Sequence, residues 1–241
     1  MQNKHIVHII GGLNTGGAET QLRSLALAQV NSGVKVTVLV FKIANTSIES
    51  ELLNNGINVI ELGIERSSFI SGIRELSKRL AEFSGNSTVF QSWMYAADLF
   101  TSFAYLLQNS KVRSKCKIFW NIRSTVFTGF NKFRLKNYII SLVCIPLSYF
   151  VPKKVICCAF SAEATHIKWK YDKKKMVTIQ NGIDIEKFVI NPEWRVDKRA
   201  SIQVHKDTFL LGFVGRNDPI KNVYAFIQSF AELTKRDNNV A

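Results

Sequence analysis

The chain has 241 residues, 46% of them hydrophobic, and a formal net charge of +14. This length and composition suit one large domain, or one domain with part of a second, and exclude a small fold that depends on disulfides. The four cysteines form no Cys-x-x-Cys pair and the four histidines lack metal-ligand spacing. We therefore expect reduced core cysteines in a cytosolic compartment and no metal site.

The excess positive charge lies in one block of the chain. Residues 110–175 hold 15 basic and 2 acidic groups, whereas residues 1–109 hold 8 of each and residues 176–241 hold 9 and 8. Aromatic residues interleave with the basic ones. Such a block suits an anionic membrane surface, a polyanionic substrate or nucleic acid, and a solvated surface is the simpler interpretation.

A glycine-rich loop follows the first apolar run. Residues 6–10 form this run, glycines stand at positions 11, 12, 16 and 17, and a segment with helical apolar spacing comes next. Strand, glycine loop and helix bring a helix N-terminus close to a phosphate, because glycine allows positive φ and close approach and the first N–H groups of a helix attract anions. The spacing is not Gly-x-Gly-x-x-Gly, so the loop alone indicates little.

Strands and helices alternate along the following residues. We expect strands over 34–41, 57–62, 88–92, 117–122, 155–159 and 176–180. We expect helices over 48–55, 69–83, 96–107 and 130–150, the last kinked or broken at Pro146, and a further helix with Ser161 as its N-cap. This alternation predicts an α/β fold, a Rossmann-like parallel sheet with helices on both faces, whose ligands bind beyond the carboxyl ends of the strands.

The composition changes after Gly182. Residues 183–207 are rich in charge and poor in apolar residues, residues 209–215 read as a buried strand, and residues 223–235 read as a helix. One strand and one helix cannot bury a core. We therefore expect an N-terminal domain over 1–182, a linker over 183–207, and the incomplete start of a second Rossmann-like domain over 208–241.

Five motifs, in this order, resemble those of retaining glycosyltransferases of the GT-B fold, of the family-four type that assembles bacterial surface polysaccharides and lipopolysaccharides. They are Gly-Gly-Leu-x-x-Gly-Gly-Ala-Glu (11–19), Gln-Ser-Trp-Met-Tyr-x-Ala-Asp-Leu (91–99), Trp-Asn-Ile-Arg-Ser (120–124), Asn-Gly-Ile-Asp-x-x-x-Phe (181–188) and Gly-x-Val-Gly-Arg-x-x-Pro-x-Lys (212–221). Members of that family have two Rossmann-like domains that face each other across a cleft. The N-terminal domain mainly takes the acceptor, and the C-terminal domain mainly takes a nucleotide-activated sugar.

The resemblance implies binding residues on both sides of that cleft. For the donor diphosphate they are Gly16, Gly17, Arg216 and Lys221, and the two cations would also stabilise the leaving nucleoside diphosphate. For the acceptor they are Trp93, Tyr95, Asp98 and Arg123. Simpler interpretations are core packing for the aromatic residues, a helix-start role for Asp98 and a structural salt bridge for Arg123.

No cofactor besides the nucleotide-sugar substrate is implied, and no Asp-x-Asp motif is present that would hold a metal. Relatives often carry histidine where this chain has Ala96 and Ser124. We therefore assign no general base, and the catalytic residues stay unknown.

Three functions stay open at this point. The first is retaining transfer of a sugar from a nucleotide-sugar to a saccharide or lipid-linked acceptor, by a cytoplasmic protein whose block 110–175 would dock on the anionic inner face of the plasma membrane. The second is an inactive, truncated acceptor-binding domain, because the family's nucleotide pocket and paired glutamates lie beyond the point where this chain stops. The third is a basic nucleic-acid-binding protein, although no helix-turn-helix, zinc or RNA-binding signature supports it.

Overall fold

The structure, a computed structural model, describes residues 4–64, 69–124, 132–186, 188–215, 221–237 and 239–241, with only the backbone of 132–134. The chain divides into two compact units, Met1–Gly182 and Ile183–Ala241. We call them unit 1 and unit 2 and describe each by itself.

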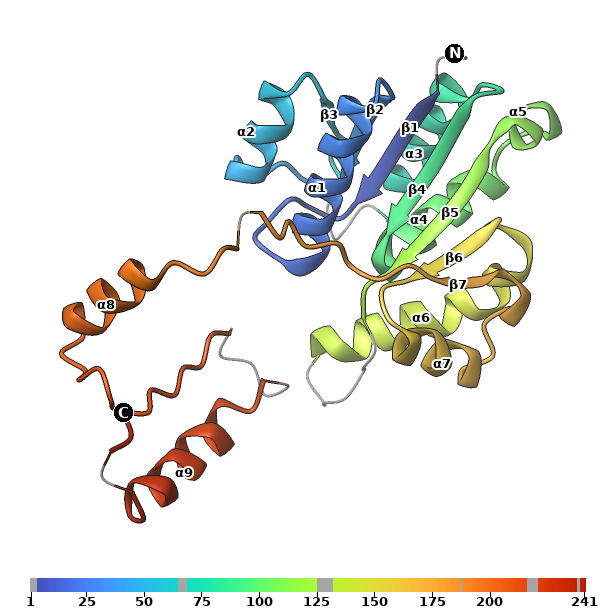
Figure 1. The fold of residues 1–241 in the computed structure, drawn as a ribbon. Helices are drawn as coiled ribbons and strands as arrows, with labels where there is room; N and C mark the ends of the chain where they lie inside the picture. The colour runs from blue at the N-terminus through green and yellow to red at the C-terminus, as the bar shows by residue number, and fades with distance from the viewer. Residues whose placement is uncertain (1–3, 65–68, 125–131, 187, 216–220, 238) are drawn as a thin grey trace. The chain divides into compact units, whose positions relative to one another are not determined.

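Unit 1 is built on a seven-stranded sheet with the order β3-β2-β1-β4-β5-β6-β7 (Figure 1). Every neighbouring pair is parallel. The strands are β1 (His5–Ile10), β2 (Lys35–Val40), β3 (Asn58–Glu61), β4 (Thr88–Trp93), β5 (Lys117–Ile122), β6 (Lys154–Cys157) and β7 (Met176–Thr178). The parallel Rossmann-like sheet that the alternation of elements predicted is thus confirmed.

Helices cover both faces of this sheet, as predicted. They are α1 (Gly17–Asn31), α2 (Ser47–Asn54), α3 (Phe69–Phe83), α4 (Met94–Leu106), α5 (Ser110–Lys115), α6 (Lys132–Phe150) and α7 (Phe160–Lys168), followed by a short 3-10 helix, η1 (Lys173–Lys175). Helices α1 and α2 pack on one face around Leu22, Val38 and Leu52. Helices α3, α4, α6 and α7 pack on the other face, in a core that includes Leu76 and Phe90.

Three local features of unit 1 differ from the sequence-based expectation. Helix α6 continues through Pro146, so the break that was one of the two expected outcomes is not found; Pro146 lies on the exposed side of the helix, where the carbonyl that loses its N–H partner can turn to solvent. Helix α7 has Ala159 as its N-cap, so Ser161 already lies in the first turn. Helix α5 was not expected; Asn109 caps it by accepting a hydrogen bond from the N–H of Val112 at 3.0 Å.

Unit 2 holds helices α8 (Pro192–Ser201) and α9 (Val223–Thr234). The strand expected over 209–215 does not form as a strand. Instead, Phe209 makes an isolated parallel bridge with Val240, and the N–H of Leu211 donates to the carbonyl of Ala241 at 2.8 Å.

Candidate functional site

The glycine loop ends at an uncapped helix N-terminus. Gly16 is the N-cap of α1, with φ −159° and no side-chain hydrogen bond to the cap. The expected positive φ is not found in this loop, since the glycines with positive φ are Gly33, Gly56 and Gly63 among the described residues. A Cβ on Gly17 would meet nothing within 4 Å. Neither the turn nor the packing requires glycine at position 17, and no side chain caps the first N–H groups of α1. The carboxylate of Glu19, in the first turn, lies against Gly16, so this side chain would have to turn away before an anion binds there.

The rest of the loop is fixed to the body of unit 1. Leu13 is buried in the core on the α1 side, and its carbonyl accepts a hydrogen bond from Thr46 Oγ1 at 2.7 Å. Thr46 is also the N-cap of α2. The loop before α1 is therefore anchored to the core by Leu13 and to the start of α2 by Thr46.

Trp93, at the end of β4, is fully buried and hydrogen-bonded. Its Nε1 donates to His8 Nδ1 at 3.1 Å, and His8 Nε2 lies 2.8 Å from Gln29 Oε1. The imidazole is therefore neutral, with its proton on Nε2, and burial lowers the pKa of His8 to about 4. The predicted contact between Trp93 and a sugar is not supported by this placement, because the indole has no exposed surface.

Arg123 follows β5 and lies on Trp93. Its guanidinium carbon is 5.0 Å from the centroid of the indole ring, and Nη1 donates a hydrogen bond to Asn181 Oδ1. Partial burial lowers the pKa of Arg123, although the group remains a cation at neutral pH. In addition, Gln21 Nε2 on α1 donates to the carbonyl of Gly182 at 2.9 Å. The Asn-Gly motif is thus joined both to Arg123 and to the first helix.

Asn121 is a site residue that the sequence analysis did not single out. It is 1% exposed and pairs in register with Trp93, so the two side chains share one face of the sheet. Neither atom of its amide has a hydrogen-bond partner, and the same holds for Arg123 Nε. A buried unpaired polar group costs about 1–3 kcal/mol. The sequence signal that could have identified it is a single amide side chain among the apolar residues that end β5.

Tyr95 and Asp98, predicted to contact the acceptor, lie in the core instead. The hydroxyl of Tyr95 is 2.7 Å from His166 Nε2, and Asp98 Oδ1 accepts a hydrogen bond from Ser92 Oγ at 2.5 Å. Burial raises the pKa of Asp98 well above its usual range. Both side chains are packed among α4, α6 and α7, so neither is available to a ligand at the carboxyl edge of the sheet.

The predicted residues of unit 2 are placed only in part. Arg216 lies outside the described residues. Lys221 is exposed and precedes Asn222, the N-cap of α9. The donor role of these two cations stays a prediction.

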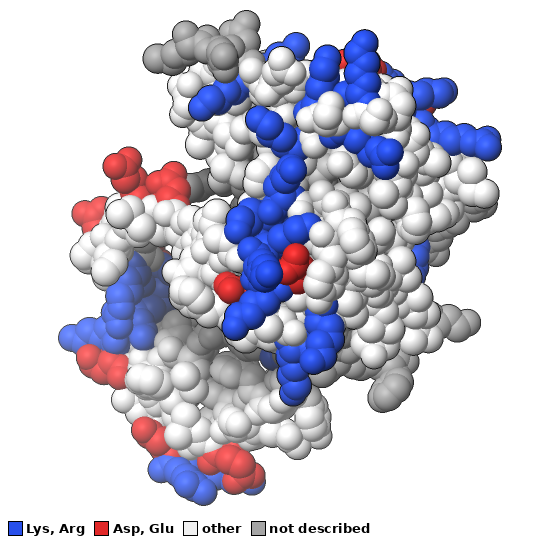
Figure 2. Space-filling model, turned by 90° about the vertical axis from the view of Figure 1, so that its right-hand side faces the viewer, with Lys and Arg blue, Asp and Glu red and all other residues white. Residues whose placement is uncertain are grey.

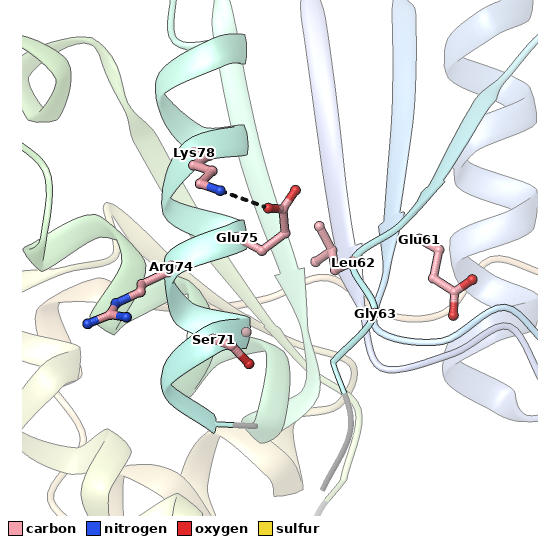
Figure 3. Close-up of a pocket in the computed structure, with 8 residues that line it drawn as sticks. Glu61, Leu62, Gly63, Ser71, Arg74, Glu75 and Lys78 are labelled. Atoms are coloured by element: carbon pink, nitrogen blue, oxygen red, sulfur yellow. Dashed lines mark ion pairs between the residues drawn. The ribbon is translucent and has the colours of Figure 1, made fainter. Parts of the chain in front are cut away.

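Other candidate sites in the described residues are few. No group of three His, Cys, Asp or Glu side chains there is arranged to hold a metal, and the four cysteines are free. A cavity of about 620 Å³ lies between β3 and α3 (Figure 3). Glu75 and Lys78 line it and form an ion pair at 3.7 Å. Strand β3 is one of the two edge strands of the sheet, and none of the predicted site residues lines this cavity.

Known proteins are similar to this chain in sequence and in fold. Residues 15–187 match the model of Glycosyltransferase Family 4. The chain is 23% identical over 238 residues to the putative glycosyltransferase EpsF of Bacillus subtilis (strain 168), which covers 97% of this chain and 59% of that protein.

The fold is similar to that of Anabaena Alr3699/HepE in complex with UDP-glucose, with a TM-score of 0.72 and 16% identity over 95% of this chain and 57% of that one. It is also similar to the apo form of the lipopolysaccharide outer core galactosyltransferase WaaB, with a TM-score of 0.58 and 17% identity over 92% and 57% of the two chains. The chain spans about three fifths of the length of these proteins. The family model matches well over half of the chain, which therefore belongs to glycosyltransferase family 4 and has the Rossmann-like fold of GT-B glycosyltransferases.

Proposed function

We propose that the protein moves a sugar from a nucleotide-sugar donor to a saccharide or lipid-linked acceptor in surface polysaccharide synthesis, with retention of the anomeric configuration. One observation carries the proposal. Motifs far apart in sequence meet at the carboxyl edge of the sheet, where Trp93 supports Arg123 and Arg123 bonds Asn181. Gln21 of α1 joins the same segment through Gly182. Family membership and the UDP-glucose held by HepE support this class of donor.

The proposed donor contacts use the start of α1. The N–H groups at Gly16 and Gly17 would bind the diphosphate, since a helix N-terminus carries partial positive charge and this one has no side-chain cap. Arg216 and Lys221 would supply the compensating cations. They would stabilise the charge that develops as the nucleoside diphosphate leaves, without a bound metal.

The proposed acceptor contact is Arg123. The indole ring of Trp93 and the side-chain amide of Asn181 hold its planar guanidinium in place. The side chain therefore loses little conformational entropy when it binds a phosphate or orients a hydroxyl. Asn121 lies beside Trp93 on the same face of the sheet and is as deeply buried, so it is not part of the proposed contact.

Isothermal titration of the chain with UDP-sugars and other nucleotide-sugars tests the donor site. The sharpest variant is Gly17→Asp, because an acidic residue in the first turn stabilises a helix but repels a diphosphate. Gly17→Ala is the matched control, since its Cβ meets open space. We expect Gly17→Asp to keep the melting temperature of the parent and to bind at least about tenfold more weakly, a difference of about 1.4 kcal/mol. Equal affinity of both variants would remove the α1 contact from the proposal.

A transfer assay with labelled nucleotide-sugar and a lipid extract as acceptor tests the reaction. NMR of the product gives its anomeric configuration, and an inverted product would refute retention. If titration with each of the nucleotide-sugars gives no binding heat, the result would favour the alternative, an acceptor-binding domain without a functional donor site. Arg123→Lys keeps the charge but not the planar fork, so we expect it to raise KM for the acceptor while the affinity for the donor is unchanged.

A further inference from the structure

The outward face of α6 is almost entirely apolar. Between residues 135 and 150, the exposed positions recur at helical spacing and have side chains with 40% to 79% exposure, as in Tyr138, Val143 and Phe150. The set is Leu135, Tyr138, Ile139, Leu142, Val143, Tyr149 and Phe150, with Pro146 among them. One charged residue, Lys136, shares this face. We call it the α6 face.

The helix cannot turn this face inward, because its other side is fixed by specific contacts. Ser141 and Ser148 are fully buried. The carbonyl of Ser141 accepts a hydrogen bond from the hydroxyl of Tyr171 at 2.9 Å, and Ser148 Oγ accepts one from the N–H of Asp172 at 3.0 Å. A surface helix normally buries its apolar stripe and exposes polar residues. Here the buried side holds Ile140 and Cys144 together with the two serines, and large apolar residues cover the exposed side as well.

A basic segment flanks the α6 face. Tyr149 OH donates to the carbonyl of Lys170 at 3.0 Å, and Tyr138 packs edge-on against Trp169 with ring centroids 6.0 Å apart. Residues 168–175 hold five lysines and a single acidic residue, Asp172. Within the described ranges, no ion pair to a carboxylate involves these lysines. Figure 2 shows lysine and arginine side chains gathered in a band with few acidic neighbours, on the side where β6 and β7 lie in Figure 1.

We propose that the α6 face is a membrane-docking surface, which lies in the interface of an anionic bilayer while the lysines of 168–175 contact the headgroups. A contiguous exposed apolar surface marks an interaction site, and basic residues beside it favour anionic lipid by about 1 kcal/mol each. Tyrosine and tryptophan at the border suit the interfacial layer. None of the helices within the described parts of the chain is long and apolar enough to span a bilayer.

Two arguments fix the occupant and its consequence. A second copy bound symmetrically through the α6 face would bring two basic flanks together, whereas an anionic surface neutralises them. Moreover, α6 is the helix that follows β5, so it begins at the same carboxyl edge that carries Arg123. Docking would bring this edge to a lipid-linked acceptor. That consequence rests on the proposed function, but membrane binding itself does not.

Vesicle sedimentation tests the docking surface without any transfer reaction. We expect the protein to bind vesicles of equimolar phosphatidylcholine and phosphatidylglycerol and to bind phosphatidylcholine vesicles far more weakly. The variant Ile139→Ser with Leu142→Ser should weaken binding to anionic vesicles at least about tenfold, because both side chains leave the inserted surface. Both are exposed, so the variant should keep its circular dichroism and melting temperature.

The matched control is Leu53→Ser on α2, a residue of similar exposure on the opposite face of the sheet. It should bind vesicles as the parent does. Equal binding to neutral and anionic vesicles, or parental binding by the double serine variant, would overturn the proposal. So would a dimer in analytical ultracentrifugation that the double variant abolishes, because the α6 face would then be covered by a second copy.

Discussion

Protonation of His8 should destabilise unit 1, because this imidazole is buried in its neutral form. It accepts a hydrogen bond from Trp93 Nε1 at 3.1 Å and its Nε2 faces Gln29 Oε1 at 2.8 Å. A proton added to Nδ1 would place two N–H donors against each other. Burial accordingly lowers the pKa of His8 from 6.5 to about 4.

The size and sign of the effect follow from proton linkage. Between pH 6.5 and about 4, the unfolded chain binds a proton at His8 and the native protein does not. The contribution of His8 to the free energy of unfolding is therefore complete above pH 6.5 and falls by about 1.4 kcal/mol for each pH unit below it. Over the whole window the loss amounts to about 3 kcal/mol. Such a loss is a large part of the stability of an ordinary domain.

Urea unfolding followed by tryptophan fluorescence, at several pH values from 4.5 to 7.5, measures this effect. His8→Asn keeps an acceptor for Trp93 but cannot titrate. Its free energy of unfolding should therefore be lower than the parent's at neutral pH, and the slope of that free energy against pH should be smaller by the contribution of one proton. Asp98 titrates in the opposite sense over the same range, so the difference between variant and parent isolates His8. Parallel curves for His8→Asn and the parent would refute a neutral buried His8.

Three further predictions concern stability and the site. Burial raises the pKa of Asp98 well above its value in the unfolded chain, so the unfolding free energy should fall by up to about 1.4 kcal/mol per pH unit as the pH rises from about 4 toward the native pKa, and Asp98→Asn should remove that slope in the same urea series. Gly72→Ala should cost about 1–3 kcal/mol in thermal unfolding, because its Cβ would lie 2.9 Å from atoms of Ile64 and Phe100; an unchanged melting temperature would show that the helix contact yields. Asn121→Leu should raise the unfolding free energy by about 1–2 kcal/mol, because it removes a buried amide without partners; a loss of stability would mean that this amide is paired in solution.

The sequence alone determined the class of fold and, apart from helix α5, the order of the strands and helices of unit 1. A period of two residues or 3.6 residues is a local property, so the parallel sheet and its helices could be predicted, and so could most element bounds within a few residues. The five ordered motifs also indicated the family, since they combine glycine, proline and charged residues at fixed spacing. The same local signals misplaced the cap of α7 at Ser161, because the helix there begins earlier and its N-cap is Ala159, two residues before.

The tertiary structure alone decided where the side chains point. Trp93, Tyr95 and Asp98 lie within six positions of each other at one strand end, and the sequence predicted one ligand for all three. The structure separates them, because Tyr95 finds a partner 71 residues away in His166, while Trp93 turns to the other face of the sheet and supports Arg123. The apolar outward face of α6 likewise follows from which side of the helix Tyr171 and the sheet cover. Periodicity shows that a helix has two faces, but only packing against distant elements determines which of them is buried.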